Sequence, residues 1–239
     1  MSLEDKQILH LKIEKLSFNG GRGVARHKGF VIFIPDTLPD EEVEVQIHKV
    51  KKNYAEGILL KVITPSPHRV SPPCSHFGKC GGCCWQHIQY DQQVIFKAKI
   101  FAEFLGKLPS SPLPLPFVPS PKTLNYRNRI QVHKNGNTIG FHRRGSHHVE
   151  AIRQCLIADH HINDYLARHR EQFPPGRTEI FLDHTSQAHH RKSVQHNDLY
   201  FSQVNVEQNE NLKRTISLWI HNLDIKFALD LIDKFHNLD

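Results

Sequence analysis

Alternation of apolar and polar residues is clearest in the first sixty positions. Residues 43–47 alternate with period two, as a half-buried strand does. Residues 30–34 form a short apolar run that ends at the turn signal Pro35-Asp36. Similar strand-like stretches lie around residues 11–16 and 54–63. Several short strands in so few residues predict a small closed barrel.

Two later segments follow a helical period instead. Residues 90–108 carry apolar side chains mostly three and four positions apart, which predicts an amphipathic helix that packs on a core. Six of the next thirteen residues, 109–121, are prolines, so we expect an extended connection there. A further helix is expected at about residues 206–223.

Charge is distributed unevenly along the 239 residues. The formal net charge is +7, and residues 67–155 hold 12 Lys and Arg against 3 Asp and Glu. Clustered cations favour a polyanionic partner, although a solvated basic face remains an alternative. No apolar run approaches the ~18–20 residues that span a bilayer, and no signal peptide is evident, so we expect a cytoplasmic protein without a membrane partner.

Nineteen histidines include the adjacent pairs His147/His148, His160/His161 and His189/His190. Neighbouring side chains point in different directions on a helix or a strand, so such pairs are poor chelates. We interpret them as surface residues or as pH-dependent positive charge.

The order of residues in the first segment resembles a TRAM domain, a small OB-like barrel of RNA-modifying enzymes. The resemblance rests on residues 13–16, 20–26 and 33–35, and on Leu38-Pro39-Asp40-Glu41 followed by residues 51–55. Asp40 stands where TRAM domains typically have glycine. The resemblance implies RNA contact through the glycine loop with Arg22 and Arg26, and through Lys51 and Lys52; a purely supporting barrel is the alternative.

Cysteines are clustered in a manner that favours a metal over disulfides. Cys74, Cys80 and Cys83 form a C-x5-C-x2-C cluster, Cys84 follows, and Cys155 lies far downstream. From spacing alone, both zinc and an iron–sulfur cluster are open.

The sequence around these cysteines, residues 73–83 with Gln86-His87, resembles the cluster motif of the bacterial 23S rRNA uracil-5-methyltransferases. The resemblance implies a structural [4Fe-4S] cluster held by Cys74, Cys80, Cys83 and Cys155, with zinc as the alternative metal. Cys84 has no place in this set and is expected to be a small buried residue.

A basic hairpin is predicted after the proline-rich connection. Residues 124–130 and 140–146 flank a turn at Asn135-Gly136-Asn137, and the same elements recur in the resembled family. Arg127 and Arg129 are expected on one strand face, where they could form a fork for phosphates. We expect RNA contacts from Tyr126, Arg127, Arg129, Arg143 and Arg144, because only Glu150 offers an acidic partner between residues 104 and 158; a salt-bridged arginine row is the alternative.

Residues 198–205 resemble the entry to the family's methyltransferase domain, in which Phe201 and Gln203 match residues that line the active site. Residues 227–231 fit the next strand, but no glycine follows it. The family's cysteine nucleophile has no counterpart here. We therefore expect no catalytic residues and no binding of S-adenosylmethionine.

The predicted fold class is α+β and β-rich, in three parts. A TRAM barrel (residues 1–66) precedes an iron–sulfur α/β domain for RNA recognition (residues 67–200). Residues 201–239 are expected to hold only the first helix and strand of a Rossmann-like methyltransferase domain that is otherwise absent.

Four functions are compatible with this sequence. We favour an RNA-binding iron–sulfur protein, directed to 23S rRNA, that is not catalytic alone. The alternatives are the recognition half of a split S-adenosylmethionine-dependent 23S rRNA methyltransferase with a separate catalytic subunit, a decayed product, and a zinc-stabilised nucleic-acid module.

Overall fold

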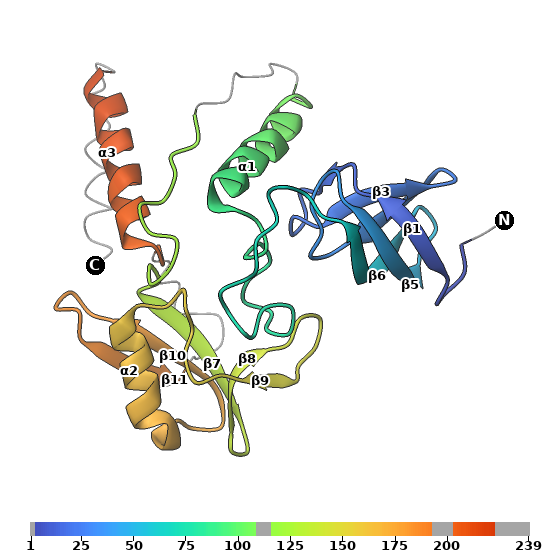
Figure 1. The fold of residues 1–239 in the computed structure, drawn as a ribbon. Helices are drawn as coiled ribbons and strands as arrows, with labels where there is room; N and C mark the ends of the chain where they lie inside the picture. Colours follow the sequence, from blue (N-terminus) through green and yellow to red (C-terminus); the bar gives the residue numbers. More distant parts are fainter. Residues whose placement is uncertain (1–2, 109–115, 193–202, 223–239) are drawn as a thin grey trace. The chain divides into compact units, whose positions relative to one another are not determined.

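The structure is a computed structural model that describes residues 3–108, 116–192 and 203–222 (Figure 1). The chain divides into two compact units, Met1–Pro119 and Ser120–Asp239. Each unit has its own sheet and its own buried core. We describe each unit by itself.

The first unit is built on a strongly bent six-stranded sheet with the order β1-β5-β6-β4-β3-β2. All its pairings are antiparallel except that of β4 with β6. Alternate residues of β1 and β5 are buried, as the sequence pattern predicts. The strands are β1 (Ile8–Lys12), β2 (Lys15–Leu16), β3 (Gly23–His27), β4 (Phe30–Ile34), β5 (Glu42–Val50) and β6 (Tyr54–Thr64).

A tight turn between β4 and β5 accounts for the departure from the TRAM pattern at Asp40. Asp40 has a φ of 69°, in the left-handed region that glycine adopts without strain. Aspartate is among the few other residues that tolerate this region. The backbone here therefore keeps the conformation that a glycine would favour.

A fully buried carboxylate holds this turn against the segment after β6. Glu41 is 0% exposed, and its side chain accepts the backbone N–H of Leu38 (2.9 Å) and of Ser66 (3.2 Å). Arg69 donates Nε and Nη2 to the two oxygens of Glu41, at 2.5 and 2.7 Å. Arg69 also reaches the carbonyl of Asp36 at 2.8 Å. The charge of Glu41 is thus compensated on all sides, as burial requires.

The cysteine-rich segment and helix α1 (Tyr90–Leu105) complete the first unit. Trp85 donates its indole N–H to the carbonyl of Gly21 at 3.1 Å and packs with Leu16, Leu38 and Phe96. A side chain at Gly21 would meet the Trp85 ring at 2.1 Å, so only glycine fits there. The glycine loop is therefore packed against its own unit.

The second unit contains a five-stranded antiparallel sheet with the order β11-β10-β7-β8-β9. Its strands are β7 (Arg129–Asn135), β8 (Thr138–His142), β9 (Val149–Ala151), β10 (Gly176–Leu182) and β11 (Ala188–Lys192). The pairing of Asn135 with Thr138 confirms the predicted hairpin, and Gly136 has a φ of 56° in its turn.

Helix α2 (His160–His169) covers one face of this sheet. Ile162 and Leu166 of the helix pack with Ile130, Val132 and Ile180 of the strands. A short 3-10 helix, η1 (Arg170–Gln172), follows. The side chains between these apolar residues point to the opposite face of the sheet.

Helix α3 (Val206–Asn222) begins at a clear cap. The side chain of Asn205 accepts the backbone N–H of Gln208 at 3.0 Å and donates to the hydroxyl of Ser120. Lys122 pairs with Glu207 at 2.5 Å, which raises the pKa of the lysine and lowers that of the glutamate through their hydrogen bond. None of the helices in the described ranges is long and apolar enough to cross a bilayer.

Candidate nucleic-acid interface

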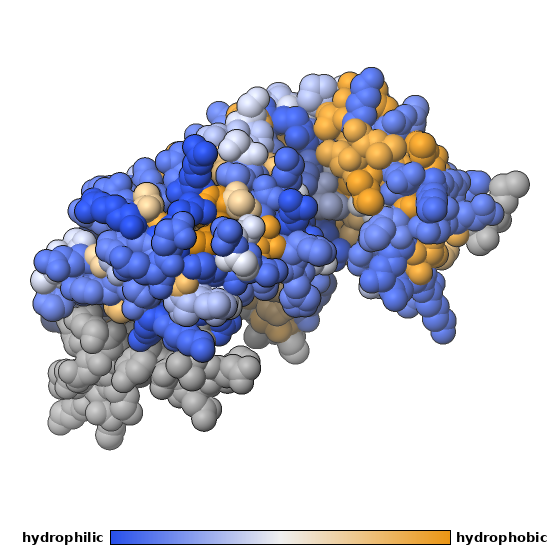
Figure 2. Space-filling view, turned by 90° about the horizontal axis from the view of Figure 1, so that it is seen from below, coloured by the Kyte–Doolittle hydropathy of each residue, from blue (hydrophilic) through white to orange (hydrophobic). Residues whose placement is uncertain are grey.

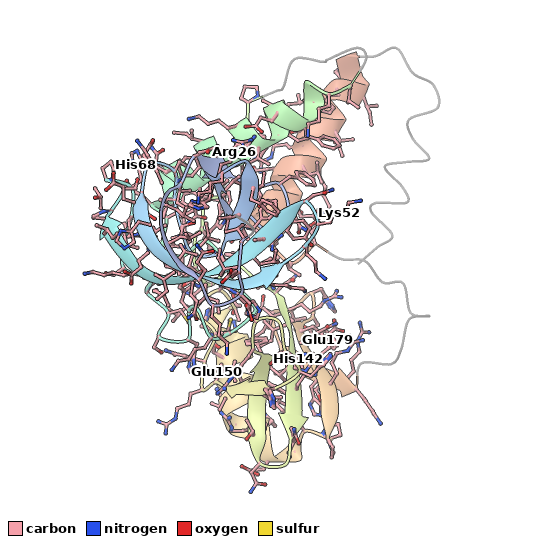
Figure 3. The ribbon with its side chains drawn as sticks, turned by 90° about the vertical axis from the view of Figure 1, so that its right-hand side faces the viewer. Arg26, Lys52, His68, His142, Glu150 and Glu179 are labelled. Atoms are coloured by element: carbon pink, nitrogen blue, oxygen red, sulfur yellow. The ribbon has the colours of Figure 1, made fainter. Side chains whose placement is uncertain are left out.

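The two arginines expected to contact RNA from the barrel are both engaged within it. Arg22 lies 3.6 Å from the carboxylate of Glu56 and stacks over the ring of Phe33 at 4.8 Å. Arg26 pairs with Glu14. Figure 3 shows Arg26 on the barrel, where its side chain remains 54% exposed.

Lys51 and Lys52 occupy the turn between β5 and β6. Both side chains are exposed, and the backbone N–H of Lys51 closes the turn on the carbonyl of Tyr54 at 2.8 Å. This turn gives the barrel a solvated positive charge at one point. The surface around it differs in character, because much of the hydrophobic surface in Figure 2 lies over the barrel, where Ile8, Ile58, Leu60 and Ile63 are exposed.

Of the two arginines predicted to form a fork, Arg129 is held by a partner that is distant in the sequence. Arg129 lies in β7 and approaches Glu179 of β10 at 3.3 Å, while Arg191 of β11 donates to the other oxygen of Glu179 at 2.7 Å. Glu179 is buried, so it binds the two arginines at a dry position. The expectation that acidic partners are scarce was wrong, because it counted only neighbours along the chain.

Arg127 precedes β7 and is fixed by its backbone. Its N–H donates to Ile157 and its carbonyl accepts from Asp159, each at 2.9 Å. Within the described ranges, its buried Nε has no hydrogen-bond partner. Arg127 is therefore a half-buried cation whose backbone position is well defined.

The remaining predicted RNA contacts lie around β8 and before β7. Tyr126 and Arg144 are half-buried, whereas Arg143 is exposed and donates Nε to Glu150 at 2.9 Å. Glu150 lies in β9, and Figure 3 labels it on the second unit. Gln203 is exposed, and Phe201 lies outside the described residues.

The loop of Cys74, Cys80 and Cys83 has several features of a thiolate site. All three side chains are half-buried, and the N–H of Gly82 points to the sulfur of Cys80 at 3.4 Å. The N–H of Cys74 donates to the side chain of Gln86 at 3.3 Å. Half-buried thiols with an N–H donor at one sulfur fit either a zinc site or an iron–sulfur cluster. Cys84 is exposed, which contradicts the expectation of a buried residue.

A buried histidine packs against this loop. His87 is 2% exposed and its ring lies 5.5 Å from that of Phe77, within the loop. Burial lowers the pKa of His87 to about 4, with a further contribution from the positive charge of Arg69. His87 is therefore neutral at pH 7.

Cys155 lies in the second unit, in the turn before α2. Asn163 of α2 fixes this turn, since its side chain accepts the N–H of Cys155 at 2.8 Å and donates to the carbonyls of Cys155 and Ala158. Asn163 was not among the predicted site residues, because α2 was not predicted. The signal for Asn163 in the sequence was its place eight residues after Cys155, a candidate ligand.

Comparisons with known proteins identify the family of the first segment and the relatives of the whole chain. Residues 4–60 match the TRAM domain family. The chain is 37% identical over 233 residues, 93% of its length, to a protein of Bdellovibrio bacteriovorus named an uncharacterized RNA methyltransferase. Proteins of Nostoc (37% over 68% of this chain) and Aquifex aeolicus (38% over 71%) carry the same description. The chain spans 59%, 36% and 40% of these three relatives.

A solved structure shares the fold. The Pyrococcus abyssi tRNA (uracil-54, C5)-methyltransferase, in complex with S-adenosyl-L-homocysteine, matches 87% of this chain with a TM-score of 0.61 and 21% identity. The chain covers 64% of that protein. The chain thus contains a TRAM domain and is similar to proteins named RNA methyltransferases.

These findings correct two expectations. The expected absence of a Rossmann-like methyltransferase domain is wrong as a description of the fold class, because 87% of the chain matches a methyltransferase structure and 93% aligns with a relative named an RNA methyltransferase. The expectation that S-adenosylmethionine does not bind is also contradicted, since the matching structure holds S-adenosyl-L-homocysteine. The relatives favour the methyltransferase alternative over a stand-alone RNA-binding protein.

Proposed function

We propose that this chain is the RNA-recognition part of an S-adenosylmethionine-dependent RNA (uracil-C5) methyltransferase that acts on 23S rRNA. The observation that carries the proposal is the alignment of 93% of the chain, at 37% identity, with a protein named an RNA methyltransferase. The TRAM match at residues 4–60 supports RNA as the partner.

The charge distribution supports the same partner. Residues 67–155 carry most of the excess positive charge, and polyanions reward such clustering through the release of counterions. Lys51, Lys52 and Arg143 are exposed, and Arg22, Arg26 and Arg129 keep a part of their side chains accessible beside their acidic partners. We assign RNA contact to these residues together with Tyr126, Arg127 and Arg144.

Cys74, Cys80, Cys83 and Cys155 are proposed to hold a [4Fe-4S] cluster, with zinc as the alternative. Four thiolates suit either metal centre. With all four positions taken by protein, the cluster supplies structural cross-linking instead of substrate chemistry. The chain's own contribution is to fix the ligands, through Gln86 at Cys74 and Asn163 at Cys155.

Metal analysis tests the ligand set. Anaerobically purified protein should contain about four iron and four acid-labile sulfide per chain, and Cys80→Ser or Cys155→Ser should lose them. Cys84→Ser is the matched control, because Cys84 is adjacent to Cys83 yet exposed and outside the set. Stoichiometric zinc without iron would replace the cluster assignment with the zinc alternative.

The activity is tested on the protein purified anaerobically from its native host with its associated chains and RNA. We expect enrichment of a defined 23S rRNA segment and the formation of 5-methyluridine when S-adenosylmethionine is added, measured by mass spectrometry. Size-exclusion analysis then shows whether methyl transfer belongs to one polypeptide or needs a separate subunit. Preparations that neither retain RNA nor methylate rRNA would overturn the proposal.

A further inference from the structure

The five-stranded sheet of the second unit has two faces of different chemistry. Helix α2 and the apolar residues Ile130, Val132 and Ile180 occupy one face. Strand alternation places the neighbours of these residues on the other face. In the antiparallel register, Arg177 stands opposite His133, Glu179 opposite Gln131, and Phe181 opposite Arg129.

The outward face carries rings in close contact. His133 of β7 and His142 of β8 stack with ring centroids 3.7 Å apart, and His147 meets His142 edge-on at 5.5 Å. Phe181 lies 5.9 Å from His189. Figure 3 shows His142 and Glu179 on this one sheet.

The same face is positively charged. Arg129, Arg177 and Arg191 project from it, and Glu179 is the acidic residue between two of them. Arg191 lies over the ring of Phe181 at 5.1 Å. Burial, the nearby His142 and Arg177 lower the pKa of His133, so its ring is neutral at pH 7 and suited to stacking.

We propose that this outward face is a stacking platform for unpaired bases of single-stranded RNA, with His133, His142 and Phe181 as the rings that receive them. Arg177 and Arg191 pair with the phosphates between these bases. This inference rests on the proposed RNA-recognition function and adds the form of RNA that is bound.

Charge complementarity identifies the occupant. Arg129, Arg177 and Arg191 outnumber the acidic residues beside them, which are the buried Glu179 and Asp183, the latter bonded to His189. This excess of positive charge fits a polyanion, whereas an apolar partner segment would leave the cations desolvated. Flat rings on a sheet face receive bases that are splayed out of a helix, as RNA-binding sheets do. A-form duplexes keep their bases stacked inside, so they can engage only the arginines.

The test measures fluorescence anisotropy of a labelled 12-nucleotide oligouridylate and of a labelled RNA duplex with the full chain, purified anaerobically. The double variant His133→Ala with His142→Ala should lose about tenfold in affinity for the oligouridylate, and Phe181→Ala about fivefold, because each base stack contributes substantially. Affinity for the duplex should change less than twofold. His160→Ala is the matched control, since His160 belongs to the helix on the opposite face.

Two further readouts separate stacking from charge and from misfolding. Phe181→Trp should retain the affinity and show additional quenching of tryptophan fluorescence when oligouridylate binds. Arg177→Ala should lower the salt dependence of binding by about one phosphate contact, whereas the ring variants leave that slope unchanged.

The outcomes distinguish this inference from the proposed function. Wild-type protein that binds RNA while the ring variants bind oligouridylate equally well, or a Phe181→Trp protein without added quenching, overturns the platform alone. Wild-type protein that binds neither probe and retains no rRNA overturns both.

Discussion

Both units of this protein bury glutamate that holds arginine, and the arrangements around Glu41 and Glu179 differ in what they leave exposed. Glu41 in the first unit is fully buried, and two backbone N–H groups and Arg69 surround its carboxylate. Glu179 in the second unit is 5% exposed, and its donors are the side chains of Arg129 and Arg191.

The difference separates a structural ion pair from one that prepares a surface. Around Glu41, the donors come from two segments that the carboxylate ties together, the β4–β5 turn and the segment after β6, and the side chain of Arg69 is only 22% exposed. Around Glu179, Arg191 keeps 48% of its side chain exposed, so its charge remains available to a ligand. An arginine in an ion pair is therefore not excluded from binding RNA. The exposed fraction of its side chain decides whether its charge can reach a ligand.

The largest effect should come from breaking the first arrangement. Arg69→Ala leaves the buried charge of Glu41 without its cation and should destabilise the first unit by about 3–5 kcal/mol. Chemical denaturation followed by circular dichroism measures this loss. The double variant Arg69→Met with Glu41→Leu removes both charges and should lose clearly less. A loss below about 1 kcal/mol for Arg69→Ala would contradict the structural role of the pair.

The second prediction concerns the pH dependence of the free energy of unfolding, which follows from another buried side chain of the first unit. The pKa of His87 is about 4 in the folded protein and ordinarily 6.5, so between these values the unfolded state binds the extra proton. Stability therefore rises with pH across this window, and about 3 kcal/mol is lost as pH falls from above 6.5 to 4. His87→Gln should remove this part of the dependence. If the stability of wild type and His87→Gln changes in parallel with pH, His87 is not the source of this dependence.

The second arrangement is tested by Glu179→Gln. The variant weakens two charged hydrogen bonds and should cost about 1–3 kcal/mol of stability. It also frees the charges of Arg129 and Arg191, so RNA affinity at low salt should rise a few-fold with a steeper salt dependence. Glu41→Gln, the matched control, should destabilise the protein without strengthening RNA binding. Unchanged affinity in Glu179→Gln would show that these arginines do not face the RNA.

The smallest effect is a gain. Asp40→Gly should stabilise the first unit by about 0.5–1 kcal/mol, because glycine adopts the φ of 69° without a side-chain clash. Thermal melting measures the gain. Asp5→Gly is the control, since Asp5 is exposed and lies outside the positive-φ positions, and it should not stabilise. A lower melting temperature for Asp40→Gly would indicate that the Asp40 side chain contributes more than its backbone strain costs.

Much of the first unit could be predicted from the sequence. Period-two alternation identified β5, a short apolar run identified β4, and a strand-like stretch identified β6, because these strands bury one face against a local core. The helical period identified α1 as a helix, but its predicted packing on a core was wrong for most of its apolar residues, since Phe96 is the one buried residue of this helix. The elements after residue 150 could not be predicted in the same way. Helix α2 buries only Ile162 and Leu166 among polar and histidine residues, and β11 reads AHHRK, so neither has a strong apolar pattern.

By itself, the sequence determined the barrel strands, the basic hairpin and the candidate cysteines, because these follow from residue type and short-range spacing. Only the tertiary structure decided which charges are compensated. Arg129 and Glu179 are 50 positions apart and meet because β7 pairs with β10 in one register. The stack of His133 and His142 likewise depends on the hairpin pairing, and a shift by one residue would turn one ring to the opposite face. The register between β7 and β10 is a long-range property, so the place of Phe181 and Arg177 beside these rings could not be derived from local pattern.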